Sequence, residues 1–553
     1  MVFRAKSVSN SKDIPQSTTN LPAINAKAII EEDEENKGPT NRFIYKRGIS
    51  QVTRRQIQVN RSLNDQAQRK RGFTVNTYPS RSELETLQLV IQKNDWQEGT
   101  SPFEGHLVWY GLPLREWDMK QLQKKPKLIF NKYPGSEYLW RKKTLSILIS
   151  RMKRYFPEEY NFMPKEYVIP EEQEELEVYI KKHPANWMIA KPSRGRGGEG
   201  IFIFKGQFNP PFNQTEFVVQ KYISKPMLVE AKKFDIRLYV LITKLDPVEC
   251  YFWNEGMVRF WTEDYKRPTK DNSKELCKHL TNFCINKESE NYINPQEYGE
   301  ENRGSKRLFS KFFEQLEKDS EFDNKKVKSE IISTIKKTII TLIPYLRASS
   351  KKWINPDLSK VRCFQLIGID ILLDQNNKAW LMEINANPSM NMFLEKINAE
   401  GEYERTLSEL DKYLKCLVIE DAIKIVKSKK PLDDWGIYTK ILPSDDELDN
   451  RYYIWDRVRE IFSKLSGVKK NDVITAGQFQ KLGRFPQLIR PHFTKANFDI
   501  IFKEATHKNE TNYMSCEEFY NALEMWVLKV YEDGYDYQNL ENYVSEIEKA
   551  LSS

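Results

Sequence analysis

The sequence has few of the residues that build disulfide frameworks and zinc sites. Six cysteines are scattered over 553 residues without a C-x-x-C pair, and only five histidines accompany them. Structural zinc sites need closely spaced thiolate and imidazole ligands, so this pattern argues against zinc. We expect the cysteines to be reduced and mostly buried, without disulfides.

Long apolar runs and a strong charge of one sign are also missing. No run reaches the roughly 18 apolar residues that a membrane-spanning helix requires, and the first twenty residues hold no apolar core of a secretory signal. The net charge of +9 comes from 87 basic and 78 acidic residues, a small surplus for a nucleic-acid binder. We expect a cytoplasmic, multidomain monomer that binds neither membrane nor nucleic acid.

Residues 1–72 are predicted to be a disordered tail. The first forty are rich in Ser, Thr and Asn and poor in apolar side chains. Residues 42–71, here called the basic arm, hold nine basic residues and one acidic residue, Asp65. Two interpretations stay open: a solvated linker, or an arm that attracts an acidic polymer.

From Phe73 to about residue 430, short β-rich runs alternate with helical patterns, which predicts an α/β or α+β body. The expected strands lie near 107–110, 187–191, 201–204, 217–220, 236–243, 364–373 and 379–384, and the expected helices at 82–93, 141–155, 171–182 and 325–346.

Residues 445–553 are predicted to form a separate all-helical module. Ser444-x-x-Glu447 and Ser515-x-x-Glu518 are capping boxes, and apolar residues at helical spacing follow each of them. The second half loosely resembles an EF-hand, but His507, Asn509 and Thr511 stand where a calcium loop needs carboxylates. We therefore expect a packing or docking module that binds no calcium.

Four glycines between residues 195 and 200 follow Lys191. They fit G-x-G-x-x-G, but a strand and not a helix comes next, which excludes a Rossmann site. A protein kinase places its lysine after the loop, whereas Lys191 precedes it. A tight turn would need fewer glycines. What remains is a hairpin whose backbone N–H groups and nearby lysine suit a nucleoside triphosphate.

Asp370, Glu383 and Asn385 interrupt two apolar runs that flank the predicted hairpin loop 375–378. If Asp374 pairs with Ala379, Asp370 faces Glu383, and Asn385 lies on the same face. Two such carboxylates repel each other unless a cation lies between them, and hard oxygen ligands suit Mg²⁺. The alternative, solvated charges on an edge strand, fits the apolar neighbours poorly.

Several further motifs occur in a specific order along the chain. Lys191 and the glycine hairpin are followed by QKYI at 220–223, KFDIR at 233–237, MVRF at 257–260, HLTN at 279–282, GSKR at 304–307, Asp370, and E-x-N at 383–385. This order resembles the tubulin tyrosine ligase-like family of ATP-grasp amino-acid ligases, especially its polyglutamylating branch. The resemblance covers roughly residues 73–430. It implies an α+β fold with a three-lobed ATP-grasp core: an N-terminal α/β lobe at 73–140, a central lobe at 141–223, and a C-terminal lobe with the Mg²⁺ site at 224–430.

The resemblance also implies a role for each matching residue. The implied ATP contacts are Lys142, Lys191, Gly197, Gly198, Gln220, Lys221, Tyr222, Ile223, Lys233, Asp235, Thr281 and Asn282. The implied catalytic residues are Arg237, Arg259 and His279, the amino-acid pocket is Arg259, Phe283 and Lys306, and the Mg²⁺ ligands are Asp370, Glu383 and Asn385.

The implied activity is ATP-dependent addition of L-glutamate to glutamate side chains of tubulin C-terminal tails, through an acyl phosphate. The implied location is the microtubule cytoskeleton, including the cilium, axoneme or basal body. Three alternatives remain: a tubulin glycylase, a tyrosine ligase, or a non-catalytic microtubule-binding protein. Lys306 and Arg259 favour an anionic co-substrate over glycine, because both cations would otherwise be left unpaired. The complete set of Asp370, Glu383 and Asn385 disfavours the non-catalytic alternative.

Overall fold

The computed structural model describes most of the chain that follows the predicted tail. It describes residues 72–552 except 126, 194–197, 211–215, 246, 274, 276–278, 280–291, 293–303, 319–321, 354–361, 398–402, 429–433, 436–437, 444–446, 468–472, 490–493, 507–511 and 531–536. The predicted disordered tail and the basic arm lie outside the described residues. Within the described part, helices and mostly antiparallel strands are mixed in an α+β fold. No helix of that part is long and apolar enough to cross a membrane.

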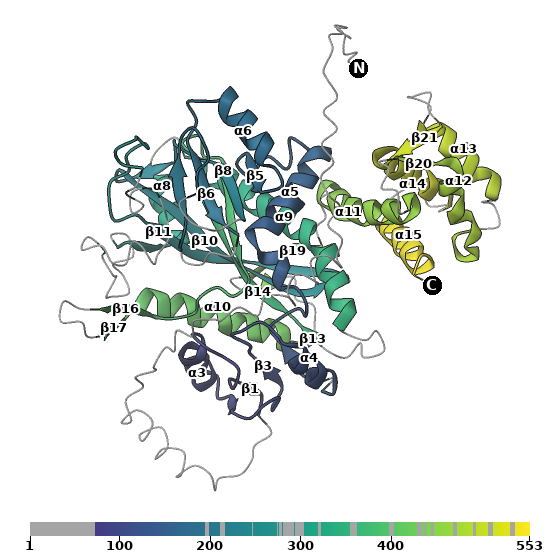
Figure 1. Cartoon of the computed structure of the whole chain (residues 1–553). Coiled ribbons are helices and arrows are strands. Elements are labelled where there is room, and N and C mark those ends of the chain that lie inside the picture. Colours follow the sequence, from purple (N-terminus) through teal and green to yellow (C-terminus); the bar gives the residue numbers. More distant parts are fainter. Residues whose placement is uncertain are drawn as a thin grey trace. The chain divides into compact units, whose positions relative to one another are not determined.

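An eight-stranded antiparallel sheet is the largest element of the fold (Figure 1). Its order is β15-β14-β10-β11-β19-β18, with β12 beside β11 and β9 beside β10. The strands are β9 (Leu228–Val229), β10 (Lys232–Leu245), β11 (Val248–Phe260), β12 (Lys306–Leu308), β14 (Gln365–Leu373), β15 (Ala379–Asn385), β18 (Asp434–Trp435) and β19 (Tyr438–Leu442). Their near-continuous apolar runs reflect a sheet that is covered on both faces.

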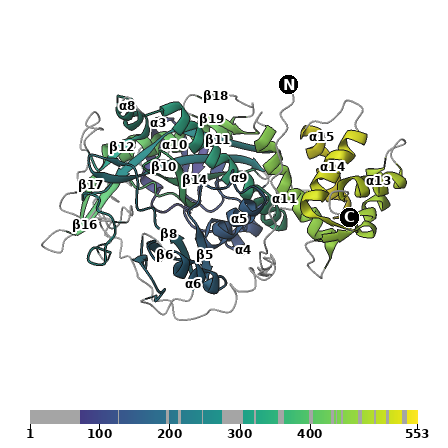
Figure 2. The same ribbon diagram turned by 90° about the horizontal axis from the view of Figure 1, so that it is seen from above.

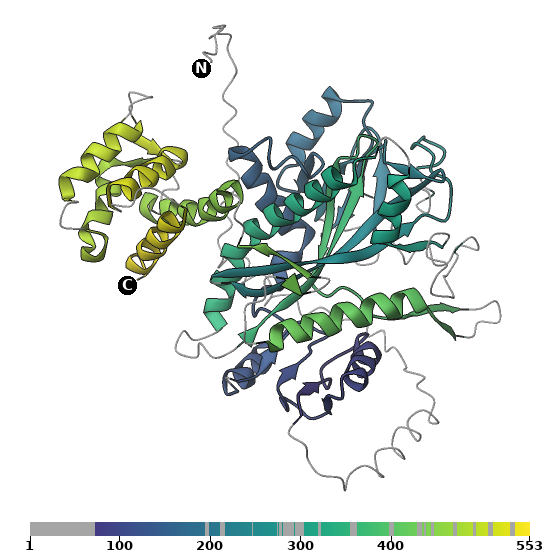
Figure 3. The ribbon, with the colours of Figure 1, turned by 180° about the vertical axis from the view of Figure 1, so that it is seen from behind.

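The two faces of this sheet pack against different layers. Alternate residues of β10, such as Ile236 and Leu238, belong to the core that includes α8 (Phe309–Glu317) and α9 (Asn324–Trp353). The intervening residues, such as Tyr239, pack with α10 (Glu409–Lys427) on the other face. Figure 3 shows α10 between the large sheet and a smaller, parallel sheet.

That parallel sheet contains the first strands of the described chain. Its order is β13-β4-β3-β1-β2, formed by β1 (Thr74–Asn76), β2 (Gln97–Gly99), β3 (Leu107–Val108), β4 (Ile129–Phe130) and β13 (Arg362–Cys363). The accompanying helices are α3 (Leu84–Lys93) and α4 (Glu116–Gln123). Because β13 runs almost directly into β14, one segment of chain connects the parallel sheet to the large sheet.

A four-stranded antiparallel sheet forms a third sheet, seen below the large one in Figure 2. Its order is β5-β8-β6-β7, from β5 (Glu166–Ile169), β6 (Met188–Pro192), β7 (Phe202–Phe204) and β8 (Phe217–Lys221). The helices η1 (Glu137–Trp140) and α5 (Lys142–Tyr155) precede it, and α6 (Gln173–Lys182) follows β5. The glycine hairpin joins β6 to β7, as predicted, and Gly198 and Gly200 have the positive φ angles, 92° and 71°, that favour glycine.

A short hairpin precedes α10. It consists of β16 (Phe393–Ile397) and β17 (Tyr403–Leu407). The guanidinium of Arg405 lies 3.5 Å from the ring centroid of Phe393 across this hairpin.

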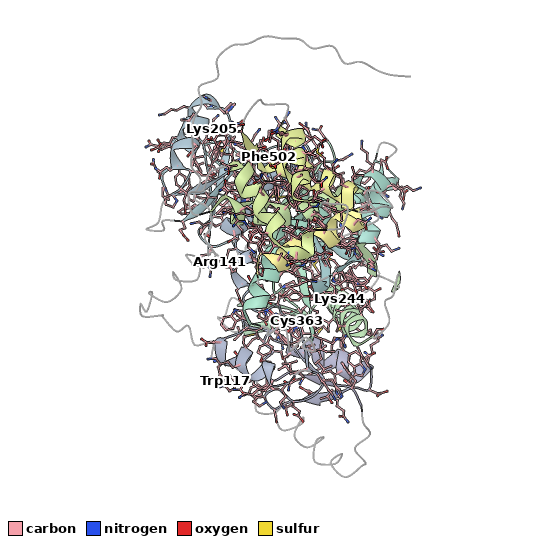
Figure 4. All side chains as sticks on the ribbon, turned by 90° about the vertical axis from the view of Figure 1, so that its right-hand side faces the viewer. Trp117, Arg141, Lys205, Lys244, Cys363 and Phe502 are labelled. Carbon is pink, nitrogen blue, oxygen red and sulfur yellow. The ribbon has the colours of Figure 1, made fainter. Side chains whose placement is uncertain are left out.

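The C-terminal segment is mostly helical. Its elements are α11 (Glu447–Ser466), β20 (Val473–Thr475), α12 (Ala476–Phe479), η4 (Gln480–Arg484), η5 (Pro486–Leu488), α13 (Lys495–Thr506), β21 (Tyr513–Ser515), α14 (Cys516–Val530) and α15 (Tyr537–Ala550). Phe502, labelled in Figure 4, lies on α13, and its ring is 6.0 Å from that of Phe479. The structure adds one short ladder, β20 with β21, that helical periodicity could not reveal. The predicted positions 507, 509 and 511 lie outside the described residues.

Two details of this segment follow from its capping residues and its apolar face. Ser515 N donates to Glu518 Oε2 at 2.7 Å, and Glu518 N donates to Ser515 Oγ at 3.3 Å, so the second predicted capping box is confirmed. The ring of Trp455 on α11 contacts Phe156 beyond the end of α5, with centroids 5.4 Å apart.

Candidate active site

A cavity of about 970 Å³ lies where the three sheets approach one another. Its wall includes residues from or beside each of these three sheets and from the amino end of α10. Ten of the predicted site residues line it: Lys142, Lys191, Gly198, Gln220, Arg237, Arg259, Lys306, Asp370, Glu383 and Asn385. Residues spread over more than 240 positions of the sequence therefore meet in one place.

The three predicted metal ligands lie on neighbouring strands. Asp370 pairs with Glu383 in the register of β14 and β15, and Gly368 pairs with Asn385. Asn385 Nδ2 lies 3.2 Å from Glu383 Oε1 and 3.5 Å from Asp370 Oδ2. The predicted pairing of Asp370 with Glu383 is confirmed. The assumed pairing of Asp374 with Ala379 is wrong by one residue, since Leu373 pairs with Ala379. An irregularity after Asp370 shifts the register by one residue, so Asp370 still lies opposite Glu383.

Two arginines share the carboxylate of Asp370. Arg237 lies opposite Asp370 on β10, donates from Nη2 to Oδ2 at 2.8 Å, and donates from Nε to Oδ1. Arg259 Nη2 lies 3.0 Å from the same Oδ2, and its guanidinium also donates to both oxygens of Asp235, at 2.6 and 2.7 Å. Burial alone would raise the pKa of Asp370, but Arg237 and Arg259 hold it well below its ordinary value. Asp370 is therefore an anion at neutral pH.

Two lysines approach the same cavity from the third sheet and from α5. Lys142 is the first residue of α5, and its Nζ lies 3.8 Å from Glu383 Oε2. Lys191 lies on β6 just before the glycine hairpin, and burial lowers its pKa to about 8 while Glu383 opposes the shift. These lysines and Gly198 place cationic and backbone donors together, as phosphate binding requires.

Gln220 supplies an acceptor that has no partner among the described residues. Its Nε2 donates to Glu166 Oε2 at 2.6 Å, whereas its buried Oε1 has no hydrogen-bond partner among the described residues. Buried polar atoms are rarely left unsatisfied. Gln220 lines the cavity, so an amino group of a bound nucleotide base would satisfy Oε1. Together with Lys142, Lys191 and Gly198, this acceptor fits ATP.

The other predicted nucleotide contacts have different positions. Lys233 is buried between the rings of Tyr222, Trp261 and Tyr265, at 4.9, 4.7 and 5.9 Å, and donates to the backbone oxygen of His279 at 3.0 Å. Burial lowers the pKa of Lys233 to about 7, with Asp235 opposing. None of these residues is among those that line the cavity.

The remaining predicted site residues are placed as follows. His279 is buried, with Nε2 3.0 Å from Asn272 O and Nδ1 3.5 Å from Tyr222 Oη, and it does not line the cavity. Lys221 is exposed and Ile223 is half-buried, and neither lines the cavity. Gly197, Thr281, Asn282 and Phe283 lie outside the described residues.

Several charged residues of the cavity wall, among them Asp411 and Lys415, were not predicted from the sequence. Lys306 donates to Asp411 Oδ2 at 2.6 Å, and Lys415 Nζ lies 2.6 Å from Asp411 Oδ1. The argument that Lys306 and Arg259 would be left unpaired without an anionic co-substrate is therefore wrong, because internal carboxylates pair with both. The sequence did hold a signal: Ser408-x-x-Asp411 caps a helix, and Lys415 follows Asp411 by one turn on its apolar face.

The donor set suits Mg²⁺ by its chemistry. Asp370, Glu383 and Asn385 offer carboxylate and amide oxygens, which are the ligands that Mg²⁺ prefers. Among the described residues, no three His, Cys, Asp or Glu side chains gather into a metal-binding group. The predicted site thus has only two carboxylates, and substrate phosphates would have to supply further oxygens.

Comparison with known proteins places this site in a family. The sequence model of the Tubulin-tyrosine ligase family matches residues 120–399, half of the chain and most of the cavity wall. The chain belongs to this family, and the predicted resemblance is confirmed. Membership implies an ATP-grasp-like α+β fold.

Curated relatives with the name tubulin polyglutamylase extend the similarity. The mouse (Mus musculus) TTLL11 is 35% identical over 401 residues, which cover 69% of this chain and 54% of that protein. The human (Homo sapiens) TTLL6 is 33% identical over 352 residues, covering 63% and 36%. The human TTLL7 is 29% identical over 438 residues, covering 76% and 48%. The chain spans about half the length, or less, of these relatives.

Proposed function

We propose that the chain is an ATP-dependent ligase that adds glutamate to glutamate side chains in the C-terminal tails of tubulin. One observation supports this most: a single cavity brings Asp370 and Glu383 together with Arg237, Arg259, Lys142 and Lys191. The phosphates of ATP and the carboxylates of the substrates would thus lie near cationic side chains and near a set of metal-binding oxygen atoms. The names of the relatives supply tubulin as acceptor and glutamylation as reaction.

The proposed reaction follows from elementary chemistry. A carboxylate resists attack by an amine until one of its oxygens becomes a leaving group, and transfer of the γ-phosphate of ATP onto the acceptor glutamate would provide that group. Lys142, Lys191 and Gly198 would bind the phosphates, and Gln220 Oε1 would accept from the base. Arg237 and Arg259 would stabilise the negative charge that develops on the transferred phosphoryl group. The amine of free glutamate would then displace phosphate and form an isopeptide bond.

Asp370, Glu383 and Asn385 would hold Mg²⁺, which would supply charge neutralisation of the phosphates. Arg237 and Arg259 both form ion pairs with Asp370 in the structure. The same two guanidiniums would be available to substrate oxygens whenever Asp370 turns to the metal.

We further propose that the parallel, four-stranded and eight-stranded sheets are the N-terminal, central and C-terminal lobes of the ATP-grasp core. The C-terminal helices would form a separate docking or packing module, and the chain would act as a monomer in the cytoplasm on microtubules, including those of cilia.

Incubation of the purified chain with ATP, tubulin and one labelled amino acid at a time tests this function. We expect label from glutamate to enter tubulin, with release of ADP and phosphate. Label from glycine or tyrosine alone would favour the alternative ligases. Microtubule binding with no incorporation of any amino acid would favour the non-catalytic alternative.

A further inference from the structure

A buried carboxylate that the proposed reaction does not use contacts Gln220. Glu166 on β5 pairs with Gln220 on β8 in the register of the four-stranded sheet, so the two side chains are neighbours on one face. Gln220 Nε2 donates to Glu166 Oε2 at 2.6 Å, and both residues are buried. Gln220 lines the cavity, whereas Glu166 is not among the residues that line it. Glu166 therefore supports a residue of the wall from behind.

The side-chain amide of Gln220 can offer a ligand either its oxygen or its NH₂ group, and Glu166 decides which. Burial raises the pKa of Glu166, while the hydrogen bond from Gln220 and the charge of Lys191 oppose this shift and favour the carboxylate. A carboxylate only accepts hydrogen bonds. A turned amide would place Gln220 Oε1 against Glu166 Oε2, and two buried acceptors in contact would cost free energy. Glu166 thus binds Nε2, and Oε1 remains as the group without a partner among the described residues.

The surroundings of this pair suit a planar base. Met163, three residues before Glu166, lines the cavity, and so does Leu145 on α5, a helix that packs against β5 and β8. Cofactor pockets typically combine such apolar walls with a few fixed polar groups. Lys191 lies on β6, which pairs with β8. A nucleotide whose phosphates contact Lys191 can therefore reach Gln220 with its base.

We propose that Glu166 is a positioning residue that fixes the side-chain amide of Gln220, so that the cavity selects a purine with a 6-amino group over one with a 6-oxo group. The amino group of adenine donates to Gln220 Oε1, whereas a 6-oxo group would place a second acceptor against it. This inference rests on the proposed function and deepens it, because it names the residue that determines the choice of nucleotide base.

The test compares the binding of ATP and of inosine triphosphate (ITP), which has a 6-oxo group in place of the 6-amino group. Calorimetry with Mg²⁺ and the full-length chain, without tubulin, measures both Kd values. The parent should bind ATP about tenfold or more tightly than ITP, as expected when a buried acceptor would lose its donor.

Glu166→Gln keeps the size of the side chain but can donate as well as accept. The Kd for ITP over that for ATP should fall to within about threefold of one, because Gln220 then has a partner in either orientation. General damage to the fold would weaken the binding of both nucleotides alike and leave this ratio unchanged.

A matched control lies a few residues further along the chain. Glu172 Oε2 accepts from the backbone N–H of Val168 on β5 at 2.7 Å. Glu172→Gln removes the same charge next to the same strand and should keep the parental Kd ratio.

Exchange of the two side chains provides a rescue. Glu166→Gln combined with Gln220→Glu keeps one amide and one carboxylate, and a carboxylate at position 220 offers an oxygen in either orientation. The preference for ATP should therefore return. A parental ratio in Glu166→Gln, a parent that binds ATP and ITP alike, or an exchanged variant without preference for ATP would overturn the proposal. A parent that binds neither nucleotide would instead refute the proposed function.

Discussion

The two carboxylates of the proposed metal site should respond differently to neutralisation. Asp370 is 4% exposed and lies between two guanidiniums, whereas the Glu383 side chain is 36% exposed and its described ion pair is with Lys142 at 3.8 Å. Asp370→Asn leaves Arg237 buried without a carboxylate, while Arg259 keeps Asp235. Removing one partner of a buried pair costs about 3–5 kcal/mol. We expect about 3 kcal/mol, because only one of the two arginines loses its carboxylate partner.

Glu383→Gln should cost far less stability. An exposed ion pair contributes about 0–1 kcal/mol, and Gln keeps the volume of Glu. Both variants should nevertheless lose on the order of 10²-fold or more in rate, because each removes a proposed Mg²⁺ ligand and so weakens the charge stabilisation that the metal would give the transferred phosphoryl group.

Urea unfolding followed by tryptophan fluorescence, together with ADP release in the presence of tubulin and glutamate, separates the two effects. The midpoint of unfolding should fall for Asp370→Asn and stay near that of the parent for Glu383→Gln. Equal midpoints would refute the account of the buried arginine pairs. Parental activity in Glu383→Gln, within a factor of two, would remove Glu383 from the proposed metal site.

Three further predictions concern nucleotide binding, the arginine pair and the partner. Burial lowers the pKa of Lys191 to about 8 and phosphate favours its charged form, so ATP binding should take up a proton and weaken as pH rises from 7 to 9. Calorimetry in buffers of different ionisation enthalpy measures this, and a proton count of zero at pH 8.5 would contradict it. A Cβ on Gly368 would lie 3.0 Å from Arg237 Cδ and from Pro388 Cβ, so Gly368→Ala should lower kcat severalfold with little change in ATP affinity; unchanged kcat would show that Arg237 tolerates the shift. Deleting the basic arm (residues 42–71) should weaken microtubule co-sedimentation and flatten its salt dependence, because salt screens such attraction over about 8 Å at physiological ionic strength, and equal binding at low salt would make the arm a linker.

Local patterns were enough to predict seven of the twenty-one described strands and the pairing at the centre of the site. The loop 375–378 is flanked by two apolar runs, and a two-stranded register across a short loop has few alternatives. Asp370 and Glu383 could therefore be paired from the sequence, even though the irregularity after Asp370 could not be foreseen. The glycine hairpin was likewise local, because one strand precedes it and one follows it.

The contacts of α10 could not be predicted in this way. Asp411 meets Lys306 from 105 positions away, and only the packing of α10 against the large sheet brings them together. The family resemblance named Lys306 but not Asp411 or Lys415. Lys306 was therefore expected to lack a carboxylate partner within the protein. A charged residue that the sequence assigns to ligand binding can therefore already form an ion pair inside the protein.

The charged residues of the central strands are explained by their ion-pair partners on the neighbouring strands. Asp235 and Arg237 are two residues apart on β10, so both side chains lie on one face of the sheet. Asp235 pairs with Arg259 on β11, and Arg237 pairs with Asp370 on β14. Burying any one of these four charges alone on an interior strand would cost free energy. That cost is offset because each charged side chain has a cross-strand neighbour of the opposite sign. Asp370 would be attracted to bound Mg²⁺, and Arg237 would be attracted to bound phosphate. Substrate binding would then replace ion pairs within the protein with ion pairs to the ligands. The same arrangement that stabilises the buried charges thus keeps them ionised and in place for the proposed reaction.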